Sequence, residues 1–146
     1  MRTNTKIEVD SRTRLCLKLL KVLLELHAAA HAPPSRRGGL TPWALRRVQL
    51  FVEANLDRSI QVAELAGRAG LSATHFARAF KASTGTTPRA FLEDRRIAKA
   101  QKLLRESELP LAQIAAETGF STQSRFTTTF RRATGFTPAT YRRTKR

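Results

Sequence analysis

The sequence predicts an all-α protein in which one helix–turn–helix unit occurs twice, preceded by a separate N-terminal helix. Two observations predict this class: residues 60–91 resemble residues 109–141, and apolar residues recur at helical spacing throughout the chain. A hydrophobic content of 41% is enough for a packed core. We expect residues 1–40 to form the N-terminal helix and a linker, and residues 41–146 to form the domain.

The two copies share the spacing of glycine, serine, phenylalanine and proline. At an offset of 49 residues, Leu65-Ala66, Gly70 and Ser72 match Ile114-Ala115, Gly119 and Ser121. After a one-residue slip to an offset of 50, Phe76, Phe80, Gly85 and Pro88 match Phe126, Phe130, Gly135 and Pro138. A solenoid needs three or more units to bury its core, so the pair indicates a duplicated supersecondary unit.

Each copy reads as a helix, a sharp turn and a second helix, with motifs spanning about 60–84 and 109–134. In the first copy a helix over 62–69 ends at Gly70, which can adopt positive φ. Ser72 then caps a helix whose phenylalanines face the core. The second copy is expected to repeat each step with Gly119, Ser121, Phe126, Phe130, Gly135, Thr137 and Pro138.

Three further helices surround the motifs. Thr41-Pro42 begins a helix through about Asn55, with Trp43, Val48, Phe51 and Val52 expected to be buried. Residues 88–105 read as one long linker helix with Leu92, Ile97, Ala100, Leu103 and Leu104 inward. That helix would fix the distance between the motifs. A short last helix runs from Pro138 to about Arg143.

The N-terminal segment 11–30 is predicted to be a separate helix, joined by a linker at 33–39. Its apolar seam is formed by Leu15, Leu19, Val22 and Leu26. Two interpretations stand side by side: a helix packed on its own domain, or a helix that forms a homodimer.

The net charge of +16 indicates an anionic partner, with nucleic acid as the first expectation. A membrane surface is less well supported, because the polar stripe of 11–30 holds few charges and includes Glu25. Lys18 and Lys21 interrupt the apolar run there, which argues against a transmembrane helix or a signal peptide. A single cysteine, Cys16, fits a reducing cytoplasm.

Catalysis is not predicted. Cys16 lies in an apolar segment and reads as a buried, inert thiol. His27 and His31 are four residues apart, but no nearby residue completes a metal-ligand set. No glycine-rich phosphate loop or catalytic triad is found, so neither a cofactor nor a metal is expected.

Helical geometry separates a core face from a reading face in the second helix of each motif. With Phe76 and Phe80 inward, Thr74, Arg78 and Lys81 point outward, and His75 flanks them. Because recognition helices contact bases mainly with their N-terminal halves, we predict base contacts by one set of residues. This set is Thr74, His75 and Arg78 in the first motif and Gln123, Ser124, Arg125, Thr127 and Thr128 in the second.

Arginine is the strongest candidate for base readout, because its guanidinium fits guanine O6 and N7. Arg78 is therefore expected either to read guanine or to contact a phosphate. Lys81, Arg131 and Arg132 lie further along their helices and are predicted to contact phosphates. The C-terminal Arg142, Arg143, Lys145 and Arg146 are expected either to do the same or to form a solvated tail.

The stretch GFSTQSRFTTTFRRATGFTPATYR (119–142) resembles the signature of the AraC/XylS family of bacterial transcription regulators. The linker-helix residues Arg96, Ala100, Leu103 and Leu104 and the motif Leu65-Ala66…Gly70-Leu71-Ser72 are also similar to family patterns. The resemblance covers about 41–143. It implies seven helices, with two helix-turn-helix motifs in successive major grooves on one face of double-stranded DNA. It also implies a nucleoid-associated regulator, more often an activator, with RNA polymerase as a partner.

Two departures from the family pattern stand out. Thr128 occupies a position that is often basic in the family, so the second helix is expected to discriminate bases less sharply. The roughly 40 N-terminal residues leave no room for the family's usual ligand-binding domain, although 11–30 resembles its linker helix. We therefore expect a short member, a truncated product or a fragment. The alternative function is a nonspecific or architectural nucleic-acid binder, against which stand the two recognition helices.

Overall fold

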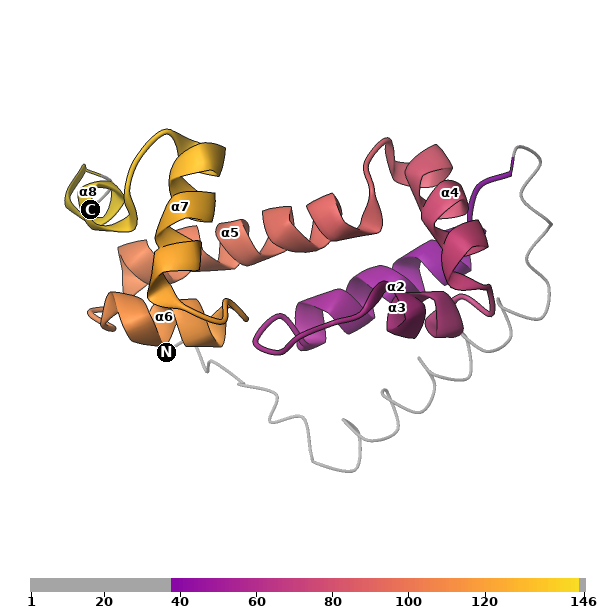
Figure 1. Cartoon of the computed structure of the whole chain (residues 1–146), viewed down its shortest axis with the longest axis horizontal. Coiled ribbons are helices and arrows are strands. Elements are labelled where there is room, and N and C mark those ends of the chain that lie inside the picture. The colour runs from indigo at the N-terminus through magenta and orange to yellow at the C-terminus, as the bar shows by residue number, and fades with distance from the viewer. Residues whose placement is uncertain (1–37, 145–146) are drawn as a thin grey trace, which may run out of the picture. The chain divides into compact units, whose positions relative to one another are not determined.

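The computed structural model describes residues 38–144, which fold into seven helices without a strand. The helices are α2 (Pro42–Ala54), α3 (Val62–Arg68), α4 (Ala73–Thr84), α5 (Pro88–Glu106), α6 (Leu111–Glu117), α7 (Gln123–Thr134) and α8 (Pro138–Thr144) (Figure 1). The all-α class and the seven helices of the domain are confirmed. The predicted helix at 11–30, Cys16, His27 and His31 lie outside the described residues.

Side-chain caps begin several helices where the sequence predicts them. Ser72 accepts a hydrogen bond from the backbone N–H of His75 at 3.4 Å, and Thr87 accepts one from Ala90 at 3.2 Å. In the second motif the expected cap, Ser121, is wrong. Thr122 caps α7 instead and accepts from the N–H of Arg125 at 3.1 Å. The extra residue of the second copy lies in its turn, so the cap moves one position along the chain.

The first motif has its own core, built from α2, α3, α4 and the start of α5. Phe76 and Phe80 are fully buried, with ring centroids 5.5 Å apart, and Val48 and Val52 are buried beside them. Trp43 and Phe51 were expected inside but are only partly buried, packed at the rim of this core. Arginine side chains cover both rings there: Arg47 lies 5.0 Å from the Trp43 centroid and Arg68 4.2 Å from that of Phe51.

The second motif has a separate core with the same construction. Phe126 and Phe130 are fully buried, with ring centroids 5.5 Å apart, and Tyr141 of α8 packs on Phe130. α5 supplies Leu92 to the first core and Ile97, Ala100 and Leu104 to the second. Leu103, also predicted inward, is partly buried. The long helix is therefore a structural part of both motifs rather than a tether between them.

Candidate nucleic-acid interface

The second helix of the first motif, α4, has one buried and one exposed face. Phe76, Ala79 and Phe80 are buried, whereas the predicted reading residues Thr74, His75 and Arg78 are exposed, as is Lys81. Within residues 38–144, Arg78 makes no hydrogen bond or ion pair. Its guanidinium therefore has all five N–H donors available to a ligand.

The second helix of the second motif, α7, repeats this division. Phe126, Thr129 and Phe130 are buried. Of the predicted reading residues, Gln123, Ser124, Arg125 and Thr128 are exposed, and Thr127 is half-buried at the edge of the face. The structure thus brings the predicted residues of each motif onto one helix surface, and their contacts with bases stay a prediction.

The predicted phosphate-contacting residues have different surroundings. Lys81 and Arg131 are exposed on the later turns of α4 and α7. Arg132 is also exposed, but its guanidinium forms an ion pair with Glu93 of α5. A phosphate would have to compete with that carboxylate, whereas Arg131 has no such partner among the described residues.

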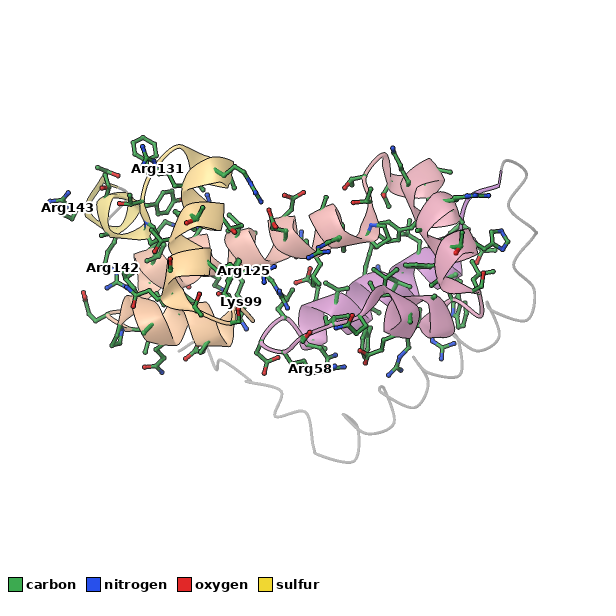
Figure 2. The ribbon with its side chains drawn as sticks, in the orientation of Figure 1. Arg58, Lys99, Arg125, Arg131, Arg142 and Arg143 are labelled. Atoms are coloured by element: carbon green, nitrogen blue, oxygen red, sulfur yellow. The ribbon has the colours of Figure 1, made fainter. Side chains whose placement is uncertain are left out.

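Arg142 belongs to the fold rather than to a solvated tail. It lies on α8, is half-buried, and donates from Nη2 to the carbonyl of Leu109 at 2.6 Å. This contact holds the segment before α6 onto the last helix, so the expectation of a solvated tail is wrong for Arg142. Arg143 is exposed and points away from the helices (Figure 2), whereas Lys145 and Arg146 lie outside the described residues.

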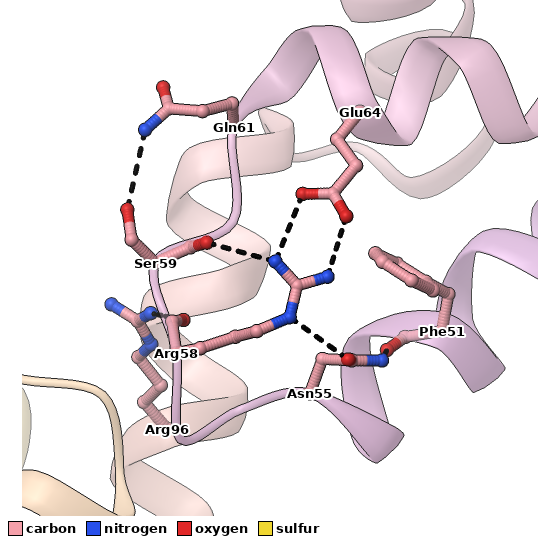
Figure 3. Close-up of polar contacts among 7 residues, drawn as sticks. All are labelled: Phe51, Asn55, Arg58, Ser59, Gln61, Glu64 and Arg96. Carbon is pink, nitrogen blue, oxygen red and sulfur yellow. Dashed lines mark hydrogen bonds and ion pairs between the residues drawn. The ribbon is translucent and has the colours of Figure 1, made fainter.

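An ion pair that sequence reasoning missed orders the loop between α2 and α3 (Figure 3). The Arg58 guanidinium contacts both carboxylate oxygens of Glu64, at 2.5 and 3.2 Å, and its Nε donates to the Asn55 side chain at 3.0 Å. The hydrogen bond from Arg58 lowers the pKa of Glu64, and the same bond raises that of Arg58. No helical periodicity joins these residues, so only the folded loop reveals the pair.

A polar cleft of about 480 Å³ lies between the two motifs. Its walls include Asp57 of the loop between α2 and α3, Gln61 at the start of the first motif, Arg89 and Arg96 of α5, and Arg125 of the second motif. Arg96 is half-buried, and burial, followed by the positive charge of Arg125, lowers its pKa, whereas Glu93 opposes the shift. Across residues 38–144, no three acidic, histidine or cysteine side chains form a metal-binding group. None of the helices there is long and apolar enough to cross a bilayer.

A family model described as a helix-turn-helix domain matches residues 65–144. The HTH-type transcriptional regulator ExsA of Pseudomonas aeruginosa is 33% identical over 132 residues, which cover 89% of this chain and 48% of ExsA. The chain therefore spans about half the length of this curated relative.

Solved structures show the same architecture. The DNA-binding domain of AdpA, a global transcriptional factor crystallised with a target DNA, matches with a TM-score of 0.65 and 33% identity. That match covers 68% of this chain and 89% of the AdpA domain. An AraC-type regulator from Chromobacterium violaceum matches with a TM-score of 0.64 and 28% identity, covering 68% and 88% of the two chains.

Proposed function

This chain belongs to the AraC/XylS family of transcription regulators, and we propose that it binds specific double-stranded DNA sites through α4 and α7. Binding there regulates transcription, with activation through RNA polymerase as the expected outcome because activation is commoner in this family. In this proposal the protein is cytoplasmic and binds DNA of the nucleoid.

The observation that carries the proposal is the pair of exposed recognition faces joined by one helix. Figure 1 shows α4 and α7 at opposite ends of α5, running in a similar direction in this view. α5 has 19 residues, so it is about 28 Å long at 1.5 Å per residue. One turn of B-DNA is about 34–36 Å, so two recognition helices joined by this spacer suit successive major grooves.

The two recognition helices contribute unequally to base discrimination in this proposal. Arg78, whose guanidinium is free of partners within the described residues, reads a guanine and contributes about 1–3 kcal/mol of discrimination. In α7, Ser124 and Thr128 can bond several bases or touch a thymine methyl, so they discriminate less. Lys81 and Arg131 contact phosphates and supply affinity that is independent of sequence.

The second candidate is a nonspecific or architectural binder, and the net charge of +16 favours it. In vitro selection from a random duplex library, at about 150 mM salt to weaken nonspecific binding, distinguishes the two. We expect enrichment of two short motifs on one face, about 10 bp apart. Enrichment of no motif, with binding that disappears steeply as salt rises, would favour the second candidate.

A further inference from the structure

Two cationic side chains of the spacer helix α5 donate hydrogen bonds to backbone carbonyls of the segments on either side of it. Arg96 donates from Nη2 to the carbonyl of Arg58 at 2.7 Å, in the loop before α3 (Figure 3). Lys99, one turn later on α5, donates from Nζ to the carbonyl of Glu117 at 2.8 Å, at the end of α6. Two cations one helical turn apart on α5 thus bind backbone carbonyls on the sides of opposite motifs.

The motifs also meet directly beside Arg96. Gly119, in the turn of the second motif, has φ +72°, and a Cβ there would clash with the carbonyl oxygen of Leu56. The same Cβ would lie 2.7 Å from Nη2 of Arg96. The turn of the second motif can therefore close onto the loop after α2 only because residue 119 lacks a side chain.

Holding Arg96 in this position has a free-energy cost. Its side chain is half-buried, its Nε is buried without a hydrogen-bond partner, and the charge of Arg125 lies nearby. The hydrogen bond to the Arg58 carbonyl and the Phe120 ring, 5.9 Å from the guanidinium, offset that cost. The Arg58 carbonyl lies in the loop that leads into the first motif, and Phe120 lies in the turn of the second motif, so both contacts exist together in only one relative orientation of the motifs.

We infer that Arg96 is a positioning residue that fixes the phase between the two recognition helices, and thereby the number of base pairs between the two half-sites. The role in DNA spacing rests on the proposed paired recognition by α4 and α7. The role in orienting the motifs does not, so the two parts are tested separately.

The orientation is measured without DNA, by the distance between spin labels on the two recognition helices. Labels attach through Ala82→Cys and Ala133→Cys, at exposed positions of α4 and α7, in a Cys16→Ser background. Arg96→Met is compared with Lys102→Met, which removes the same charge from α5 at a side chain 68% exposed. We expect a narrow distance distribution for the parent protein and for Lys102→Met, and a broader one for Arg96→Met.

The spacing is measured by binding to selected sites whose half-sites are moved apart or together by one and two base pairs. One base pair turns a half-site by about 34–36°, so we expect a one-pair insertion to weaken binding of the parent and Lys102→Met about tenfold. For Arg96→Met we expect the affinities for the selected site and for sites with one base pair more or less between the half-sites to lie within about threefold of one another. Binding to a duplex with one intact half-site should be unchanged in all three proteins.

Three results would overturn the inference. Unchanged label distances in Arg96→Met would show that Arg96 does not hold the orientation. An equal loss of affinity at every spacing, with a salt dependence reduced by about one ion, would identify a direct phosphate contact. A parent protein indifferent to spacing, with labels that still broaden in the variant, would refute paired recognition and leave Arg96 with a structural role alone. Far-UV circular dichroism verifies folding, and Arg96→Lys, which shortens the reach to Arg58, replaces Arg96→Met if the latter unfolds.

Discussion

Gly70 and Gly119 occupy corresponding turns of the two motifs, and replacing each by alanine separates two sources of instability. Both have left-handed backbones, at φ +68° and +72°. A Cβ at Gly70 would meet no atom within 4 Å, whereas one at Gly119 would clash with the Leu56 carbonyl and the Arg96 guanidinium. The two substitutions therefore share the backbone penalty, and only Gly119→Ala adds a steric one.

The left-handed conformation costs an alanine about 1–2 kcal/mol, so Gly70→Ala should lower the free energy of unfolding by that amount. Forced overpacking costs about 1–3 kcal/mol more, so Gly119→Ala should lower it by about 2–5 kcal/mol. Because 1 kcal/mol shifts the melting temperature of a domain near 100 residues by about 4 °C, the two variants should melt at clearly different temperatures.

Urea unfolding followed by far-UV circular dichroism measures both free energies, and thermal melts provide a second reading. Equal destabilisation by the two substitutions would refute the reasoning, because it would mean that the turn of the second motif does not pack against the loop after α2. A larger loss for Gly70→Ala would contradict it more directly.

Three further predictions concern single side chains. Arg78→Ala should relax base preference in one half-site only, with a loss of about 1–3 kcal/mol at its base pair, measured by sequencing selected sites; a change in both half-sites, or in neither, would contradict the assigned reading role. Lys81→Ala should weaken binding to all sequences alike and reduce the slope of log affinity against log salt by about 1, and a sequence-dependent loss would contradict a phosphate contact. Glu64→Gln should destabilise the protein at neutral pH but not in acid. The pKa of Glu64 is lowered from 4.5 by Arg58, so its stabilisation is present above that value and disappears as the pH falls through the folded-state pKa. Melting temperatures of both proteins between about pH 7 and pH 3 test this, and a constant gap would exclude the ion pair as its cause.

The helices and their inward faces could be predicted because each is specified locally. Phe76 and Phe80 lie one helical turn apart and point to one core, and a hydroxyl residue before each helix offers a cap. The same logic failed at Ser121, because Ser121 and Thr122 are both good caps and only the geometry of the turn selects between them. Local pattern was thus sufficient for element type and insufficient for one boundary.

The contacts between motifs could not be predicted for a different reason. Arg96 binds a carbonyl 38 positions earlier in the chain, and any residue type supplies a carbonyl, so the sequence holds no sign of the partner. The Arg58–Glu64 pair depends likewise on the course of an irregular loop. The exposure of the predicted reading residues, in contrast, follows from helix geometry once the buried face is known, so their placement on the outer faces of α4 and α7 can be predicted from the sequence.

The two recognition helices differ in their predicted reading residues, and this difference makes the rigidity of α5 between them more important for specificity. α4 and α7 each have 12 residues, and Arg78 and Thr128 stand at the same position of the two helices. At this position the first motif therefore presents a guanidinium and the second a hydroxyl, so we expect position 128 to discriminate bases less than position 78. A recognition helix with weak base discrimination contributes to specificity chiefly when a rigid connection holds it at one position in the groove. Loosening α5 at Arg96 should consequently reduce specificity most at the half-site of α7, while the half-site of Arg78 keeps its base preference.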